Sequence, residues 1–121
     1  MVVHHDEAFL RRAAEAKARV PGLVPEDLEQ QLERGAILID VREPAEIKSG
    51  TIRNAHNIPL DELLQEIETV IPDRSVPIVC FCTGGNRGAI AAAALLDHGY
   101  PNVQTLERGL GGVPDRLLEK G

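Results

Sequence analysis

The chain has 121 residues, a size typical of one domain, with 19 acidic and 13 basic residues and a net charge of −6. This acidic balance argues against nucleic acid and anionic membranes as partners, because both are bound through basic surfaces. Two cysteines are too few for a secreted disulfide framework, no apolar run approaches membrane-spanning length, and the N-terminus lacks a signal-peptide core, so we expect a cytoplasmic protein.

The N-terminal part of the chain predicts a helix that precedes the main domain. Residues 6–19 place apolar side chains at helical spacing, with Asp6 as a candidate N-cap, and Pro21 with the glycine after it ends the stretch. We therefore expect residues 1–23 to form a helical extension packed on a domain that spans residues 24–121. An arm that docks a partner is the alternative.

The first half of this domain alternates short helices with apolar strands. Proline starts, glycine stops and the helical spacing of leucine and isoleucine predict helices at residues 25–34, 44–49 and 60–70. Short apolar runs predict strands at residues 36–41 and 55–58.

Residues 77–99, PIVCFC-TGGNRG-AIAAAALLDHG, predict a buried strand, a tight loop and a helix. The first six residues are a continuous apolar run led by a proline, which is typical of a strand covered on both faces. The alanine-rich and leucine-rich run ends on a glycine, as helices often do. Beyond it we expect a strand at 103–106, a glycine-rich loop at 108–112 and a closing helix at 113–120.

Apolar strands that alternate with helices predict an α/β fold, with a mainly parallel central sheet and helices on both faces. In such folds, ligands bind beyond the carboxyl ends of the strands. Cys82, Asp40 and Arg42 all stand at the carboxyl ends of predicted strands. We therefore expect these residues on one rim of the sheet.

The loop that follows the strand of residues 77–82 has the features of an anion cradle with a nucleophile. Gly84 and Gly85 permit backbone angles that let successive N–H groups point at one spot, and the next helix aims its unpaired N–H groups there. Arg87 adds a positive charge. Such surroundings favour the thiolate of Cys82, which is the nucleophilic form. A buried structural cysteine before a glycine turn is the alternative.

Three segments resemble, in order, the motifs of rhodanese domains. Residues 82–87, CTGGNR, are similar to the family's Cys-x-x-Gly-x-Arg loop, and residues 38–46 to its Ile-Asp-Val-Arg-x-x-x-Glu stretch. Residues 50–59 resemble Gly-His-Ile-x-x-Ala-x-x-Ile-Pro, with Thr51 in place of histidine. The resemblance covers roughly residues 24–119. It implies an α/β fold, a cysteine persulfide intermediate, and sulfur transfer from donors such as thiosulfate to cyanide, a thiol or a protein.

The expected site has Cys82 as the catalytic residue, without a metal or other cofactor. The expected substrate-binding residues are Thr83, Gly84, Gly85, Asn86, Arg87, Gly88 and Arg42. The loop residues would act mainly through backbone N–H groups, and Thr83 would add a hydroxyl. Asp40 is expected to support the site structurally. Arg42 either faces the rim and steers anions or pairs with Glu43 or Glu46 at the surface.

Two further positions bear on this site. Gly88 stands where rhodaneses often have serine, and this change removes a hydroxyl and weakens the helix start. Cys80 lies two positions before Cys82, on the same face of the strand, and we expect it to be buried as a small apolar residue.

Two other functions remain open at this point. One is a catalytically weak sulfur relay or protein-binding module with the same fold. The other is phosphatase or arsenate reductase chemistry, which also uses a thiolate in an anion cradle. Related phosphatases have a loop with five residues between cysteine and arginine, whereas four separate Cys82 from Arg87. The expected partners are a small anionic sulfur donor and a thiol, cyanide or protein acceptor.

Overall fold

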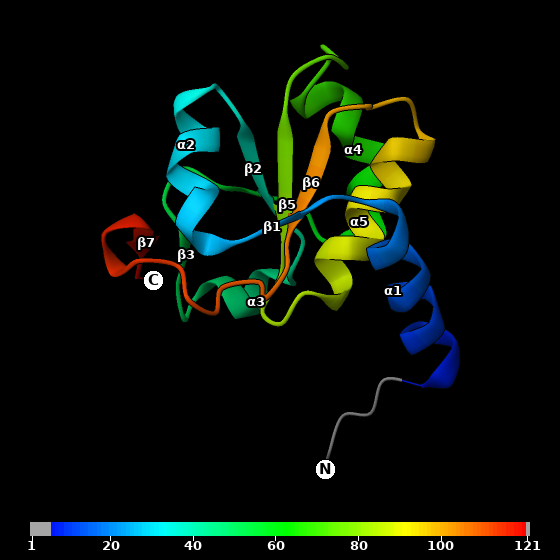
Figure 1. Cartoon of the computed structure of the whole chain (residues 1–121), viewed down its shortest axis with the longest axis horizontal. Helices are drawn as coiled ribbons and strands as arrows, with labels where there is room; N and C mark the ends of the chain where they lie inside the picture. Colours follow the sequence, from blue (N-terminus) through cyan, green and yellow to red (C-terminus); the bar gives the residue numbers. More distant parts are fainter. Residues whose placement is uncertain (1–5, 121) are drawn as a thin grey trace.

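The computed structural model describes residues 6–120, and its central layer is a five-stranded sheet (Figure 1). The strands, in sheet order, are β1 (Gly22–Leu23), β6 (Val103–Leu106), β5 (Ile78–Phe81), β2 (Ile37–Asp40) and β4 (His56–Asn57). Each strand runs parallel to its neighbours. The prediction of a mainly parallel α/β sheet is therefore confirmed.

Helices cover both faces of the sheet, as the alternating pattern predicted. The helices are α1 (Glu7–Arg19), α2 (Leu28–Glu33), α3 (Pro44–Ile47), α4 (Leu63–Val70) and α5 (Asn86–Asp97), with single 3₁₀ turns at Pro25–Asp27, Leu60–Glu62 and Asp115–Leu117. Figure 1 shows α1, α4 and α5 on one side of the sheet and α2 on the other. None of the helices within residues 6–120 is both long and apolar enough to cross a bilayer.

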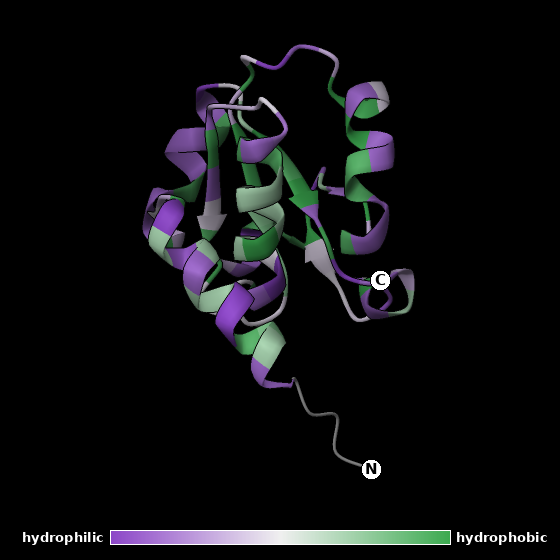
Figure 2. Cartoon of the chain, turned by 90° about the vertical axis from the view of Figure 1, so that its right-hand side faces the viewer, coloured by the Kyte–Doolittle hydropathy of each residue, from purple (hydrophilic) through white to green (hydrophobic). Residues whose placement is uncertain are grey.

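The central strand β5 shows why the sheet is buried on both faces. Its side chains alternate, so that Ile78 and Cys80 pack with α1, α4 and α5, whereas Val79 and Phe81 pack on the α2 side. All four are at most 1% exposed. In Figure 2 the strands and α5 are mostly hydrophobic, and the outer surfaces of the surrounding helices are mostly hydrophilic.

The N-terminal segment joins the rest of the chain through a helix and a strand. Asp6 caps α1 by accepting the N–H of Phe9 at 2.7 Å, and Ala13 and Ala16 are buried where α1 packs on α5. The strand β1 follows at once and forms an edge of the sheet beside β6. Its two residues give no periodicity signal, so the sequence predicted only the helix.

The predicted closing helix at residues 113–120 is wrong. The chain makes a single 3₁₀ turn at Asp115–Leu117 and then the strand β7 (Leu118–Glu119), which pairs antiparallel with β3 (Thr51–Ile52). Leu117 and Leu118 pack on the α2-side core in this extended path. The strand pairing supplies hydrogen-bond partners to backbone groups that the predicted closing helix would have to satisfy within itself. Neither strand of this pair was predicted.

Candidate functional site

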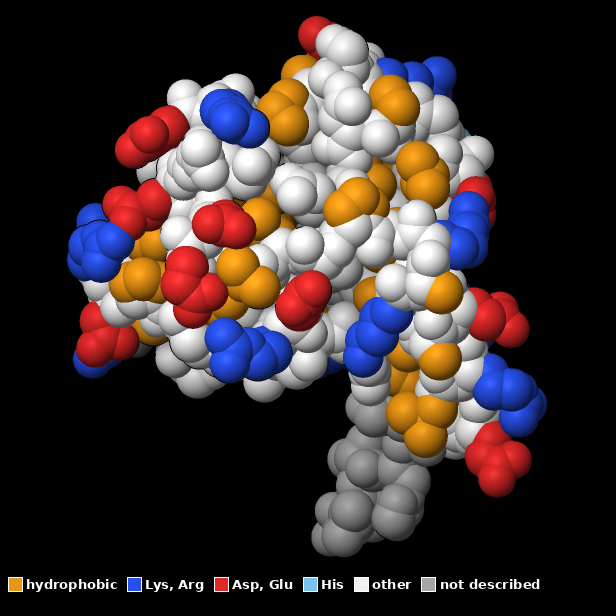
Figure 3. Space-filling view, viewed as in Figure 1, with side chains coloured by type: hydrophobic (Ala, Val, Ile, Leu, Met, Phe, Trp, Pro, Cys, Tyr) orange, Lys and Arg blue, Asp and Glu red, His pale blue; other side chains and the backbone are white. Residues whose placement is uncertain are grey.

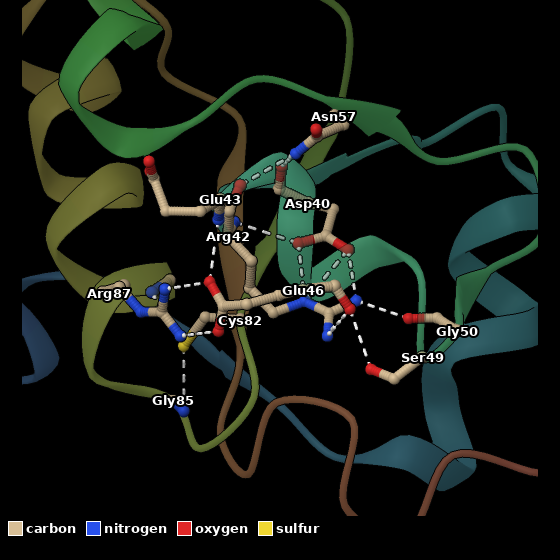
Figure 4. A network of polar contacts seen from close by, with 11 residues as sticks. Asp40, Arg42, Glu43, Glu46, Ser49, Gly50, Asn57, Cys82, Gly85 and Arg87 are labelled. Carbon is tan, nitrogen blue, oxygen red and sulfur yellow. Dashed lines mark hydrogen bonds and ion pairs between the residues drawn. The ribbon is translucent and has the colours of Figure 1, made fainter. Parts of the chain in front are cut away.

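Cys82 follows β5 directly, at the carboxyl end of the sheet, and it is 2% exposed. Its Sγ accepts hydrogen bonds from the backbone N–H groups of Gly85, at 3.1 Å, and Gly88, at 3.3 Å; Figure 4 draws the first of these bonds. Gly85 is the N-cap of α5 and Gly88 lies in its first turn. The sulfur therefore takes the place of a capping oxygen, where two N–H donors and the positive end of the helix dipole stabilise a thiolate.

A small pocket opens over this sulfur. Its volume is about 180 Å³, and it is lined by Cys82, Thr83, Gly84, Asn86 and Arg87. Thr83 and Gly84 are exposed, whereas Asn86 and Arg87 are half-buried at the start of α5. The pocket has room for a small ion or for the sulfur-bearing end of a longer molecule.

Arg87 is held by a partner that sequence analysis did not place in the site. Its Nη1 and Nη2 donate to the two carboxylate oxygens of Glu46, at 2.7 and 2.9 Å (Figure 4). These hydrogen bonds, more than any other contact, lower the pKa of Glu46 to about 2. Glu46 is therefore ionised at neutral pH, and its charge offsets that of Arg87. The signal in the sequence was the acidic end of the 38–46 segment.

Arg42 lies behind the pocket wall. Its side chain is 3% exposed, and its Nε and Nη2 donate to the carboxylate of Asp40 at 3.0 and 2.8 Å. The same guanidinium donates to the carbonyl oxygens of Glu46 and Gly50. Among the described residues, Arg42 is not one of the five that line the pocket. We therefore assign it to the framework that holds α3 and, through α3, Glu46.

Asp40 bonds to this framework as well. Besides the Arg42 guanidinium, its carboxylate accepts the backbone N–H of Arg42 at 3.0 Å and the hydroxyl of Thr51 at 2.7 Å. Thr51 occupies the position where the family motif has histidine. Asn57 closes the framework by donating to the carbonyl oxygens of Asp40 and Arg42 (Figure 4). The described hydrogen bonds of the Asp40 carboxylate run to Arg42 and Thr51 and include none to the Cys82 loop.

The glycine at position 88 has a steric reason. A Cβ there would lie 3.0 Å from the Thr105 hydroxyl oxygen and 3.1 Å from Cα of Phe81, so a serine requires a shift of a few tenths of an ångström between α5 and its neighbours. The bare backbone lets the helix start sit close on the strand, which brings the Gly88 N–H to Cys82. The absence of a side chain at position 88 therefore favours the hydrogen bond from the Gly88 N–H to the Cys82 sulfur. Sequence analysis did not foresee this contact.

A second glycine-rich loop, residues 107–112, packs against the loop that follows Cys82. The N–H of Leu110 donates to the carbonyl oxygens of both Cys82, at 3.1 Å, and Thr83, at 3.2 Å. A Cβ on Gly109 would collide with these same two carbonyls, and one on Gly85, where φ is +113°, would collide with the carbonyl oxygen of Glu107. The two loops therefore interlock through glycines. The sequence indicated a loop here but not its contact.

The other cysteine is chemically quiet. Cys80 is fully buried, and its burial, more than its proximity to Cys82, raises the pKa of its thiol to about 12. It therefore remains a neutral thiol at physiological pH. Within residues 6–120, no group of three or more histidine, cysteine, aspartate or glutamate side chains is arranged to hold a metal ion.

One contact reaches the loop from outside the domain that sequence analysis delimited. Lys17 of α1 donates from its Nζ to Oδ1 of Asn86, at 2.6 Å. Asn86 lines the Cys82 pocket and is the first residue of α5. Sequence analysis gave Lys17 no role.

Comparisons with known proteins match the chain to one domain family and to several relatives. The family model of the rhodanese-like domain matches residues 24–113. The chain is 32% identical over 82 residues to the thiosulfate sulfurtransferase PspE of Escherichia coli, covering 68% of this chain and 75% of that protein. It is 31% identical over 111 residues to a tRNA uridine(34) hydroxylase of Xanthomonas campestris, covering 83% of this chain. The chain spans 44% of that hydroxylase, so less than half of its length.

A solved structure extends the likeness to three dimensions. A thiosulfate sulfurtransferase from Pseudomonas aeruginosa superposes with a TM-score of 0.77 at 27% identity, covering 93% of this chain and 22% of that one. The sequence relatives and the solved structures therefore both include a thiosulfate sulfurtransferase.

Proposed function

Because the chain belongs to the family of rhodanese-like domains, we propose that it is a sulfurtransferase that carries sulfur as a persulfide on Cys82. The observation that carries this proposal is the position of the Cys82 sulfur. It accepts two backbone N–H groups at the start of α5 and faces a small pocket. Such donors stabilise an anionic sulfur without a proton transfer.

The first step that we propose is attack of the Cys82 thiolate on the outer sulfur of a donor such as thiosulfate. A new sulfur–sulfur bond forms, the sulfur–sulfur bond of the donor breaks, and sulfite leaves with the electron pair. The product is an ionised persulfide, Cys82–S–S⁻. The pocket over Cys82 supplies room for this terminal sulfur.

The second step passes the terminal sulfur to an acceptor. Cyanide, a thiol or the thiol of a partner protein attacks it, and the Cys82 thiolate leaves. This cycle needs no metal or organic cofactor. We propose a cytoplasmic setting, because the thiol must remain reduced between turnovers. The net charge of −6 favours a small molecule or a protein over nucleic acid or membrane, although some relatives are named for tRNA.

A second candidate is a sulfur relay that turns thiosulfate over slowly. The bidentate pairing of Arg87 with Glu46 supports it, because a neutralised arginine attracts an anionic donor less strongly. Phosphatase chemistry has less support, because the loop has four residues between Cys82 and Arg87 rather than five.

Thiocyanate formation from thiosulfate and cyanide tests the proposal. We expect Cys82→Ser to lose activity completely while its far-ultraviolet circular dichroism remains unchanged, and Cys80→Ala to remain active. Thiocyanate production by Cys82→Ser at the wild-type rate would end the proposal. A wild-type protein that accepts sulfur from thiosulfate but passes it to a protein thiol and not to cyanide would favour the relay.

A further inference from the structure

We propose that Lys17 of the N-terminal helix, rather than Arg87, supplies the positive charge that an anionic donor meets at the Cys82 pocket. This inference rests on the proposed function only in taking the anion to be a sulfur donor. Three observations carry it: the pairing of Arg87, the position of Lys17, and the acidic character of the rest of the chain.

Arg87 lines the pocket, but its charge is already matched. Both of its terminal nitrogens donate to the carboxylate of Glu46, in the bidentate geometry that arginine and carboxylate favour. An anion approaching the pocket therefore meets a pair with no net charge. Backbone N–H groups from Gly85 and Gly88 remain, and they point at the sulfur rather than at the mouth.

Lys17 is held beside the loop by a rigid element. The buried side chains Ala13, Ala16 and Val20 fix α1 on the domain, and Lys17 lies one helical turn from both Ala13 and Val20. Its ammonium donates to Oδ1 of Asn86, a residue that lines the pocket, while Lys17 itself lines the neighbouring cavity. Because Asn86 is neutral, the charge of Lys17 is not cancelled by this bond.

The surroundings make one unmatched cation significant. The chain carries a net charge of −6, and on the face shown in Figure 3 basic side chains lie singly among acidic ones. Lys17 and Glu107 both line a cavity of about 240 Å³ behind the loop, but the ion pairs that the structure describes include none between Lys17 and Glu107. Lys17 also lies outside residues 24–113, so this charge comes from beyond the family domain.

The test compares alkylation of Cys82 by iodoacetate, an anion, with alkylation by neutral iodoacetamide. The ratio of the two rates reports the potential at the sulfur, because any change in the nucleophile affects both reagents alike. Peptide mapping by mass spectrometry assigns the adduct to Cys82 over the buried Cys80. Turnover is not needed, so the test is independent of sulfur transfer.

We expect Lys17→Gln to lower the iodoacetate-to-iodoacetamide ratio about two- to five-fold at low salt, as the loss of one partly solvated charge near the sulfur would do. The effect should fade in about 0.5 M salt, where the Debye length is only about 4 Å. Lys17→Arg keeps the charge and should keep the ratio. Arg12→Gln removes the same charge from the same helix, five residues earlier, and should leave the ratio unchanged.

The paired residues give the opposing test. Glu46→Gln frees the charge of Arg87 and should raise the ratio, whereas the double variant Glu46→Gln with Arg87→Gln should match wild type. An unchanged ratio in Lys17→Gln, or a double variant that falls as far as Lys17→Gln was expected to fall, would overturn the inference alone. A Cys82 that reacts with neither reagent would overturn the proposed function as well.

Discussion

Replacing Asp40 with asparagine is expected to lower the free energy of unfolding by about 3 to 5 kcal/mol. The side chains of Asp40 and Arg42 are 1% and 3% exposed, so the loss of the carboxylate leaves a guanidinium in the interior without a counter-charge. A domain of this size is stable by about 5 to 15 kcal/mol, so the loss is a large share of the total. With a urea m-value of about 1.5 to 2 kcal/mol per molar, the midpoint should fall by about 1.5 to 3 M.

Urea unfolding followed by circular dichroism measures this change, and two variants control it. Asp97→Asn breaks an exposed ion pair with Arg19 and should move the midpoint little. Asp40→Leu with Arg42→Met replaces the buried pair by apolar groups and should recover much of the loss. A loss below about 1 kcal/mol for Asp40→Asn, at an unchanged m-value, would refute the reasoning that a dry ion pair holds α3 in place.

Three further changes probe the site. The folded-state pKa of Glu46 is depressed to about 2, so its stabilising contribution is present above about pH 4.5 and is lost as pH falls toward 2. The difference in unfolding free energy between wild type and Glu46→Gln should therefore shrink over this window. A difference that stays constant would contradict this prediction. Cys80→Ala should keep sulfur transfer and lose about 1 kcal/mol of stability, since the thiol is buried and neutral; inactivity equal to that of Cys82→Ser would require a two-cysteine cycle. Gly88→Ser should cost about 1 to 3 kcal/mol and slow iodoacetamide alkylation of Cys82, because the start of α5 must shift; unchanged alkylation would show that the Gly88 N–H contributes nothing.

Much of the architecture could be predicted because long segments carry a clear period. The run 77–99 resolves into β5 and α5 within one or two residues, and the alternation of strands and helices led to the parallel sheet. The two-residue strands β1, β3 and β7 were not predicted, because a periodic pattern needs more residues than they have, whereas β4 lies within the strand predicted at residues 55–58. The closing helix failed for a related reason: the pairing partner of β7 lies far away in the sequence.

The site could be predicted in its backbone but less well in its charges. Cys82 and the loop that follows it stand out because a glycine loop between a strand and a helix has one simple geometry. The hydrogen-bond partners of charged side chains have no such local signature. The pairing of Arg87 with Glu46 joins residues 41 positions apart, and that of Lys17 with Asn86 joins residues 69 apart. Sequence analysis placed Arg42 either at the rim or in a surface pair with Glu43 or Glu46, whereas the structure buries it beside Asp40.

The central claim, that Cys82 carries the transferred sulfur, is tested most directly by mass spectrometry of the protein after incubation with thiosulfate. We expect one added sulfur atom per chain, located on Cys82 by peptide fragmentation, removed by cyanide and absent from Cys82→Ser. Sulfur found on Cys80, or an equal gain in Cys82→Ser, would contradict the account.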